Sequence, residues 1–279
     1  ASSAPGAVEG GMPSPVGKIG TKRGTYQRPE YAGSPEACQS REPFPFLRRS
    51  PMRPVLLLCC LFLSATAQAE DCSPQTSVGS WCELPLAALH PTQQNVGLLQ
   101  VEDDQAKLAG KKPKALERYL RKKEIPVVIG PGGRFYLTDR HHLSSALWRL
   151  DPKQGVPVKV IGRLPQASDF WEKMQENHWV WLHDARGAEI PPEALPNALA
   201  GLGDDPYRAL AGYAEDENAF DKDRQSYFIE FHWARYFGER MHWRPISRAT
   251  LPDDLKQALH LACEPAAREL PGYRQDCPH

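Results

Sequence analysis

The sequence predicts an α+β domain, and three observations support this fold class. Residues 125–150 have the pattern of strand, tight turn, strand and helix. The β-branched run Ile125–Ile129 is typical of a buried strand, and Pro131–Gly133 favours a turn because glycine accepts positive φ. The segment Phe135–Leu137 then resumes a strand. Amphipathic helical patterns cover 103–123 and return after residue 204, so helices flank the strands and extend the domain at its C-terminal end.

The helix after the second strand presents polar groups at its start. Leucine and alanine at 143, 146, 147 and 150 follow an i, i+3, i+4, i+7 spacing, which gives one buried face. Thr138 or Asp139 is the expected N-cap. Arg140, His141 and His142 then occupy the first turn, where free backbone N–H groups favour an anion. The adjacent histidines project about 100° apart and can line one mouth. The alternative is a polar rim in which one imidazole caps a carbonyl.

The segment YLTDRHHLSSAL, residues 136–147, resembles the signature of the ParB/sulfiredoxin superfamily, which is a strand followed by a D-G-H-H-R-like box and a helix. From Pro91 to Arg240 the chain resembles the ParB-like nuclease family more closely. The matching pieces, in order along the chain, are PTQ at 91–93, IPVVIGPGG at 125–133, the box itself, FW at 170–171, WVWL at 179–182, DDPYRALAG at 204–212 and FIEFHWARYF at 228–237.

The resemblance implies a small mixed sheet of ParB/sulfiredoxin type with flanking helices, and a phosphate site at the TDRHH helix start. Asp139, His141 and His142 are the positions carried over. Two positions depart from the superfamily pattern: Arg140 stands where glycine is usual, and Leu143 stands where a basic residue is usual. Glycine allows close approach of a phosphate and arginine grips it, so these departures argue against nucleoside triphosphate binding.

The leading functional hypothesis is a phosphoester hydrolase, with a nuclease as one form of it. His141 or His142 is expected to act as general acid or base, because the pKa of histidine lies near working pH. Arg140 and the helix N–H groups are expected to stabilise phosphate charge. Asp139 is expected to orient a histidine or to hold a divalent ion. No cofactor is identified from the sequence, and no metal ligand set is assigned.

Two further candidates lie in the C-terminal helices. Arg208 is a spare polar group that can reach the mouth and bind phosphate, and Glu230 is a candidate general base. Two alternatives stay open. One is a nucleotide-dependent phosphotransferase of the same superfamily, and the other is a non-catalytic, exported anion-binding protein. The expected partner is a phosphate-containing small molecule or nucleic acid, with no stable membrane span and no protein partner.

The overall charge is balanced. The chain of 279 residues has 34 basic and 34 acidic side chains, which argues against a dominant nucleic-acid-binding surface but leaves room for a local basic cleft. Hydrophobic residues make up 41% of the chain, which is enough for a globular core, and 27 prolines indicate long irregular connections.

The N-terminal part has the pattern of an exported protein. Residues 1–51 predict a disordered tail or a wrongly assigned start. From Met52, one arginine, an apolar run and Ala67-Gln68-Ala69 form a signal peptide over residues 52–69, with cleavage after Ala69 and a periplasmic or secreted product. An uncleaved anchor and a lipoprotein at Cys59 or Cys60 are the alternatives.

Four cysteines remain after this signal: Cys72, Cys82, Cys263 and Cys277. An even number in an exported chain indicates two disulfides. Local loops and a clasp between the two ends of the domain both stay open, because the sequence does not choose among the connectivities.

The remaining predictions complete the domain plan. Residues 70–84 form a linker, 85–263 the domain and 264–279 a tail. The expected elements are one or two helices over 103–123, a strand at 156–161 whose proline indicates an edge or a strand start, helix 169–178, strand 179–182, a helix that Asp205 caps, helix 225–241 and helix 252–263. In helix 225–241 the predicted apolar stripe is Tyr227, Phe228, Phe231, Ala234 and Phe237, and Trp233 lies off it.

Overall fold

The computed structural model describes residues 70–222 and 226–276, so the predicted N-terminal tail (1–51) and signal peptide (52–69) lie outside the described residues. It contains a five-stranded mixed sheet in the order β1-β6-β4-β5-β2. β1 pairs antiparallel with β6, and β4 antiparallel with β5, whereas β6–β4 and β5–β2 are parallel. The strands are β1 Trp81–Pro85, β2 Leu89–Pro91, β4 Ile125–Ile129, β5 Phe135–Leu137 and β6 Gly155–Arg163.

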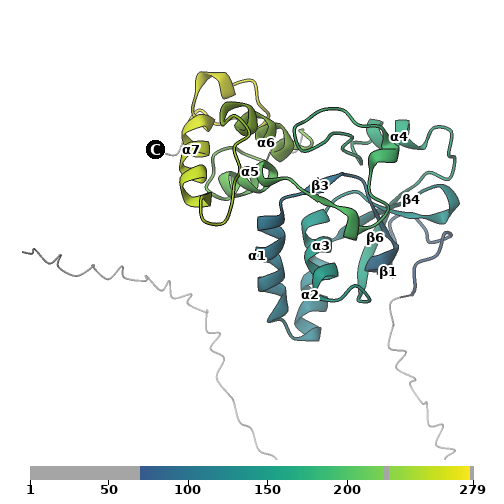
Figure 1. Cartoon of the computed structure of the whole chain (residues 1–279). Helices are drawn as coiled ribbons and strands as arrows, with labels where there is room; N and C mark the ends of the chain where they lie inside the picture. The colour runs from purple at the N-terminus through teal and green to yellow at the C-terminus, as the bar shows by residue number, and fades with distance from the viewer. Residues whose placement is uncertain (1–69, 223–225, 277–279) are drawn as a thin grey trace, which may run out of the picture. The chain divides into compact units, whose positions relative to one another are not determined.

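Helices surround this sheet and continue past it (Figure 1). A separate two-stranded parallel sheet pairs β3 Asn95–Val96 with β7 Gly203–Asp204. The predicted α+β class with a small mixed sheet is confirmed. The helices are α1 Leu98–Ala109, α2 Pro113–Lys123, α3 His141–Leu150 and α4 Phe170–Glu176, followed by α5 Pro206–Asp216, α6 Ile229–Arg240 and α7 Leu251–Ala262.

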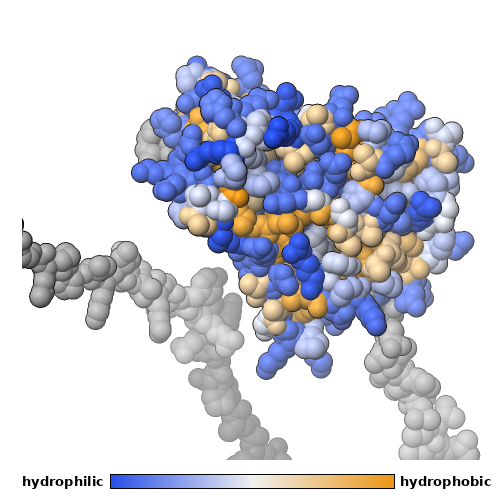
Figure 2. All heavy atoms as spheres, viewed as in Figure 1, coloured by the Kyte–Doolittle hydropathy of each residue, from blue (hydrophilic) through white to orange (hydrophobic). Residues whose placement is uncertain are grey.

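The sheet buries both faces. Neighbouring side chains of a strand point to opposite faces, so Val127 and Ile129 enter the core shared with α1–α3, whereas Val128 enters the core under α4. Tyr136 in β5 joins the α4 side, where its ring lies 4.5 Å from that of Phe170. Figure 2 shows hydrophilic side chains over most of the viewed face, with apolar surface gathered in its middle.

The helical extension has an aromatic core of its own. Trp233 in α6 is fully buried and stacks on Phe220 at 4.5 Å between ring centroids, and its Nε1 donates to the carbonyl oxygen of Pro271. The prediction that Trp233 lies off the apolar stripe is therefore wrong. Of the predicted stripe, Ala234 and Phe237 are buried in this core, whereas Phe228 precedes α6, which begins at Ile229, and Tyr227 is exposed.

The strand predicted at 156–161 is present as β6. It is not an edge strand, because β1 and β4 flank it, but Pro157 lies near its start, which is the other position that the proline indicated. Pro157 is tolerated there because pairing with β4 begins only opposite Val158, so no β4 residue needs the missing N–H. The strand predicted at 179–182 is absent. These residues form an irregular segment, in which the Trp181 N–H donates to the carbonyl oxygen of Thr92 at 2.9 Å.

The predicted disulfides are local at the N-terminal end. Cys72 and Cys82 are bonded, which removes the clasp between the two ends of the domain. Cys263 is also disulfide-bonded, and Cys277 lies outside the described residues. β1 begins inside the segment predicted as a linker, and its main chain pairs with residues 70–72. Within residues 70–222 and 226–276, no helix is long and apolar enough to cross a bilayer.

Candidate functional site

His141 is a buried connector between the start of α3 and the loop after β2. Its Nε2 accepts from the backbone N–H of Thr92 at 3.1 Å, and the Thr92 hydroxyl donates to the carbonyl oxygen of Leu137 at 2.6 Å. Burial, and to a smaller extent the positive charge of Arg208, lower the pKa of His141 to about 3, against a hydrogen bond with the Leu137 backbone. The imidazole is therefore neutral at pH 7.

His142 makes an equivalent contact with the backbone five residues after Thr92. Its Nε2 accepts from the backbone N–H of Gly97 at 2.9 Å, immediately before α1. Burial is the main reason that the pKa of His142 lies well below its ordinary value, and the charge of Arg208 adds to the effect. Both histidines are thus neutral acceptors whose Nε2 lone pairs are used by the main chain of residues 92–97.

Asp139 and Arg140 lie at the exposed rim of the same helix start. The expected side-chain cap is absent: Arg140 is the N-cap residue, and Asp139 Oδ1 accepts from the N–H of Arg140 itself at 2.6 Å. Arg140 has φ 66°, the left-handed conformation that favours glycine. This chain therefore keeps the backbone shape that the superfamily glycine supports, with an arginine in its place. The Arg140 Nε donates to the carbonyl oxygen of Lys123.

Arg208 places its guanidinium group in a largely buried position near the two histidines. Its side chain is 11% exposed, its Nη2 lies 3.3 Å from Glu230 Oε1, and its Nη1 donates to Gln100 Oε1 at 3.5 Å. The guanidinium group also lies over the ring of Phe231, 5.1 Å from the centroid. The Nε atom is buried and has no hydrogen-bond partner among the described residues.

Glu230 is held as a carboxylate by this arrangement. Burial raises the pKa of Glu230, but the charges of Arg208 and Lys222 outweigh burial and hold the pKa below its ordinary value. Lys222 Nζ lies 3.6 Å from Glu230 Oε1 and 2.7 Å from Glu215 Oε2. Burial lowers the pKa of Lys222, yet these two carboxylates raise it overall. Two cations and two anions thus lie together, with Arg208 and Glu230 largely buried and Lys222 exposed.

All six predicted site residues line one cleft of about 770 Å³. Its walls come from the start of α3, from α1, and from α5 and α6 of the helical extension. We call it the Arg208 cleft. The predicted residues in it are Asp139, Arg140, His141, His142, Arg208 and Glu230, and neighbours that the sequence did not single out as site residues are Gln93, Gln100, Lys222 and Tyr227.

The comparisons with known proteins agree with the fold. A family model described as "Putative ParB-like nuclease" matches residues 82–239. The chain belongs to the ParB-like nuclease family. Among solved structures, the ParB-like domain is similar to protein Atu1540 from Agrobacterium tumefaciens, with 29% sequence identity, a TM-score of 0.61, and coverage of 70% of this chain and 96% of that chain. None of the curated proteins is a match.

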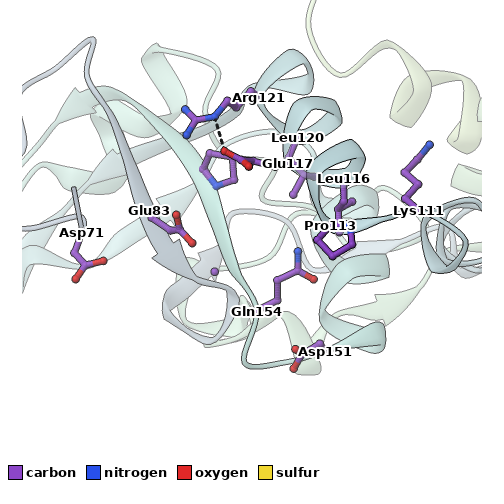
Figure 3. A pocket seen from close by; sticks show the side chains of 12 residues that line it. Asp71, Glu83, Lys111, Pro113, Leu116, Glu117, Leu120, Arg121, Asp151 and Gln154 are labelled. Atoms are coloured by element: carbon purple, nitrogen blue, oxygen red, sulfur yellow. Dashed lines mark hydrogen bonds and ion pairs between the residues drawn. The ribbon is translucent and has the colours of Figure 1, made fainter. Parts of the chain in front are cut away.

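The ParB-like domain has a second cleft, of about 860 Å³, at the β1 end of the sheet. Figure 3 shows Glu83 beside it, with Glu117 and Arg121 of α2 joined by an ion pair of 3.3 Å. It contains none of the predicted site residues. The Arg208 cleft, where charged side chains and the start of α3 come together, is therefore the candidate functional site.

Some members of the site could not be assigned from the sequence. Gln100 and Lys222 have no local signature, because each becomes a partner of Arg208 or Glu230 only after α5 and α6 fold against α1. Thr92 had a signal, since it is the centre of the PTQ piece of the family resemblance. Among the described residues, no group of three or more histidine, cysteine or acidic side chains is arranged to hold a metal.

Gly97 is required by close packing at this site. A Cβ placed on it would lie 2.6–2.7 Å from the backbone and Cβ of Ala209 in α5. We expect Gly97→Ala to lower the free energy of unfolding by about 1–3 kcal/mol, because α1 and α5 must separate. Chemical denaturation measures the loss. Gly110→Ala is the matched control, since a Cβ there meets nothing within 4 Å. Equal effects of the two substitutions would contradict this account.

The two aspartates at 204 and 205 both cap helices. Asp204 Oδ1 accepts from the N–H of Leu98 at the start of α1, and Asp205 Oδ1 accepts from the N–H of Arg208. The predicted N-cap at Asp205 is confirmed. Burial raises the pKa of Asp205 to about 6, although its hydrogen bond from Arg208 opposes the shift.

This raised pKa predicts a pH dependence of stability. Between the ordinary value of 3.8 and about 6, folded Asp205 keeps a proton that the unfolded chain has lost. This carboxyl therefore lowers the free energy of unfolding by about 2 kcal/mol as pH rises from 4 to 7. Asp205→Asn keeps a capping oxygen and should remove this contribution. Urea titrations at pH 4 and 7 compare the two proteins, and an unchanged pH dependence would contradict the assignment.

Proposed function

We propose that the Arg208 cleft binds the phosphate group of a ligand and that the protein hydrolyses a phosphoester bond there. The observation that carries the proposal is the buried guanidinium group of Arg208, whose Nε has no partner among the described residues. Guanidinium groups bind phosphate through paired, charge-assisted hydrogen bonds. A phosphate oxygen in the cleft can pair with the part of this guanidinium group that lines the cleft.

The start of α3 adds to the attraction for an anion. The helix has ten residues and begins without a side-chain cap, so its first N–H groups and its dipole favour negative charge. Arg140 at the rim adds a second guanidinium group, and Asp139 beside it is available to position a ligand or a divalent ion. The phosphate-binding roles of Arg140 and Arg208 belong to this proposal.

Glu230 is the proposed general base. Its ion pair with Arg208 keeps it ionised, and burial alone would raise its pKa. When a phosphate engages Arg208, the carboxylate loses part of that pairing and becomes more basic. Glu230 then accepts a proton from the attacking water, whose oxygen bonds to phosphorus. The bond from phosphorus to the leaving oxygen breaks, and that oxygen takes a proton from solvent.

His141 and His142 act in this proposal as positioning residues. Their neutral rings hold the backbone of Thr92 and Gly97, and thereby fix the loop that leads into α1 and Gln100. Both Nε2 lone pairs already accept from main-chain N–H groups, so proton transfer is assigned to Glu230.

A second candidate function is binding of an anion without turnover. It is favoured by the contacts of the two histidines. Both Nε2 atoms accept from main-chain N–H groups, so neither is free to transfer a proton. In that case Arg208 and the helix start form a receptor site and Glu230 only balances charge.

We also propose that the protein works outside the cytoplasm. The Cys72–Cys82 disulfide is compatible with an oxidising compartment, and the sequence pattern over 52–69 supports a cleaved signal peptide. N-terminal sequencing of the protein recovered from the periplasmic fraction tests this, and the expected first residue is Glu70.

Turnover of bis(p-nitrophenyl) phosphate and of a short single-stranded oligonucleotide, with and without Mg²⁺ or Mn²⁺, tests hydrolysis. We expect Arg208→Gln to lower kcat/KM by about 100-fold, as removal of one buried donor to a developing oxyanion does. Arg235→Gln is the matched control, because Arg235 is 58% exposed on α6 and pairs with Glu239 outside the cleft. Phosphate binding without any turnover would support the receptor function, and the absence of both would overturn the proposal.

A further inference from the structure

Tyr227 leaves an aromatic ring open inside the Arg208 cleft. The described residues expose three large apolar side chains, Val78, Leu150 and Tyr227, and of these only Tyr227 lines either cleft. Tyr227 is 51% exposed, whereas the other aromatic side chains of the helical extension are buried or half-buried. An exposed aromatic ring inside a concave site is a feature of ligand-binding sites rather than of a packed core.

His178 backs this ring. The two rings are stacked, with 3.9 Å between centroids and 16° between planes, and both residues line the cleft. His178 follows α4 with φ 55°, and Phe228, next to Tyr227, has φ 56°. Two left-handed residues that are not glycine therefore bring these rings together from segments about fifty positions apart. The backing ring fixes the plane of Tyr227, while half of its surface stays accessible.

We propose that Tyr227, supported by His178, is a stacking platform for a flat heteroaromatic ring. The ligand of the Arg208 cleft is then a nucleoside monophosphate unit, with its phosphate on Arg208 and its base on Tyr227. This inference rests on the proposed phosphate site and names the substrate class for it. Aromatic rings bind bases by their faces, so the platform accepts different bases.

The cleft selects an unpaired nucleotide over a duplex. Its volume is about 770 Å³, which suits a small ligand, and a base inside a duplex has both faces covered by its neighbours. The chain also has no excess of basic residues to hold a duplex backbone. A free nucleotide and the end of a single strand both present the required chemistry, and the experiment distinguishes these two sources.

Calorimetric titration of the full chain with AMP, ribose 5-phosphate and adenosine tests the platform. We expect AMP to bind about 5- to 150-fold more tightly than ribose 5-phosphate, which is the range of one base stacked on an aromatic ring. Tyr227→Leu should remove this difference and leave ribose 5-phosphate binding unchanged. Tyr227→Phe keeps the ring and should preserve the difference. Thermal unfolding of both variants checks that the fold is intact.

The outcomes separate the two proposals. Equal binding of AMP and ribose 5-phosphate overturns the platform and leaves the phosphate site standing. Binding of adenosine with no contribution from phosphate overturns the phosphate site, and absence of any binding overturns both. A six-nucleotide single strand that binds more tightly than AMP assigns the site to strand ends, whereas tighter binding of AMP assigns it to free nucleotides. A duplex that binds as well as either contradicts the inference.

Discussion

Replacing Arg244 by methionine is expected to lower the free energy of unfolding by about 3–5 kcal/mol at pH 7, because it leaves a buried carboxylate without its cation. Asp254 in the first turn of α7 has no exposed side-chain surface, and Arg244 Nη2 lies 2.6 Å from its Oδ1. This contact is an ion pair without a hydrogen bond, and neither carboxylate oxygen accepts a hydrogen bond from the described residues. The charge of Arg244 is therefore the main compensation for burying Asp254.

The same pair offers a matched control. In Arg244→Met/Asp254→Asn the charge is removed together with its partner, so we expect most of the lost stability to return. Urea titrations of the four proteins of this cycle provide the measurement. If the double variant is as unstable as Arg244→Met, the burial of charge is not the cause.

Local sequence patterns predicted the elements well where the buried residues recur with the period of the helix or strand that they form. The strand–turn–strand–helix unit from Ile125 to Leu150 was placed within a residue or two, because its apolar residues have the periods of the elements they form. The N-cap at Asp205 was equally local, since the residue bonds an N–H three positions away. Such features need no knowledge of the rest of the molecule.

Predictions failed where a distant segment decides the environment. Residues 179–182 have the composition of a strand but pair with none, and the ring of Trp181 packs against Phe228 and Phe231 at the start of α6 instead. His141 is predicted to line one mouth and to act as a general acid or base. It lines the cleft, but it is only 4% exposed, and its Nε2 accepts from the N–H of Thr92, 49 positions earlier in the sequence. Helical spacing contains no information about that contact.

The candidate site follows the same division. The sequence identified the helix start and the six polar residues, and the structure brings all six to one cleft. It did not identify which of them touch, because the contact of Arg208 with Glu230 requires α5 and α6 to pack together. The proton-transfer role that spacing suggested for the histidines therefore moves, in our proposal, to Glu230, whose charge state depends on that contact.

Acid should destabilise the protein strongly through His141, and His141→Gln should remove this effect. Burial and the nearby charge of Arg208 hold the pKa of His141 at about 3, against 6.5 in the unfolded chain. Below pH 6.5 the unfolded chain takes up a proton that the folded protein refuses, so stability falls as pH drops towards 3. Between pH 7 and pH 4 this one group lowers the free energy of unfolding by about 3 kcal/mol.

Glutamine at 141 can present an oxygen to the Thr92 N–H and does not titrate, so the variant should lose about 3 kcal/mol less than the wild type between pH 7 and pH 4. Urea titrations at the two pH values measure the difference. His260→Gln, on the exposed side of α7, is the matched control because its imidazole is already in water. A variant at 141 that loses as much stability in acid as the wild type would mean that folded His141 accepts a proton. In that case the loop around Thr92 opens in acid and His141 regains the proton-transfer role that its position in the box suggests.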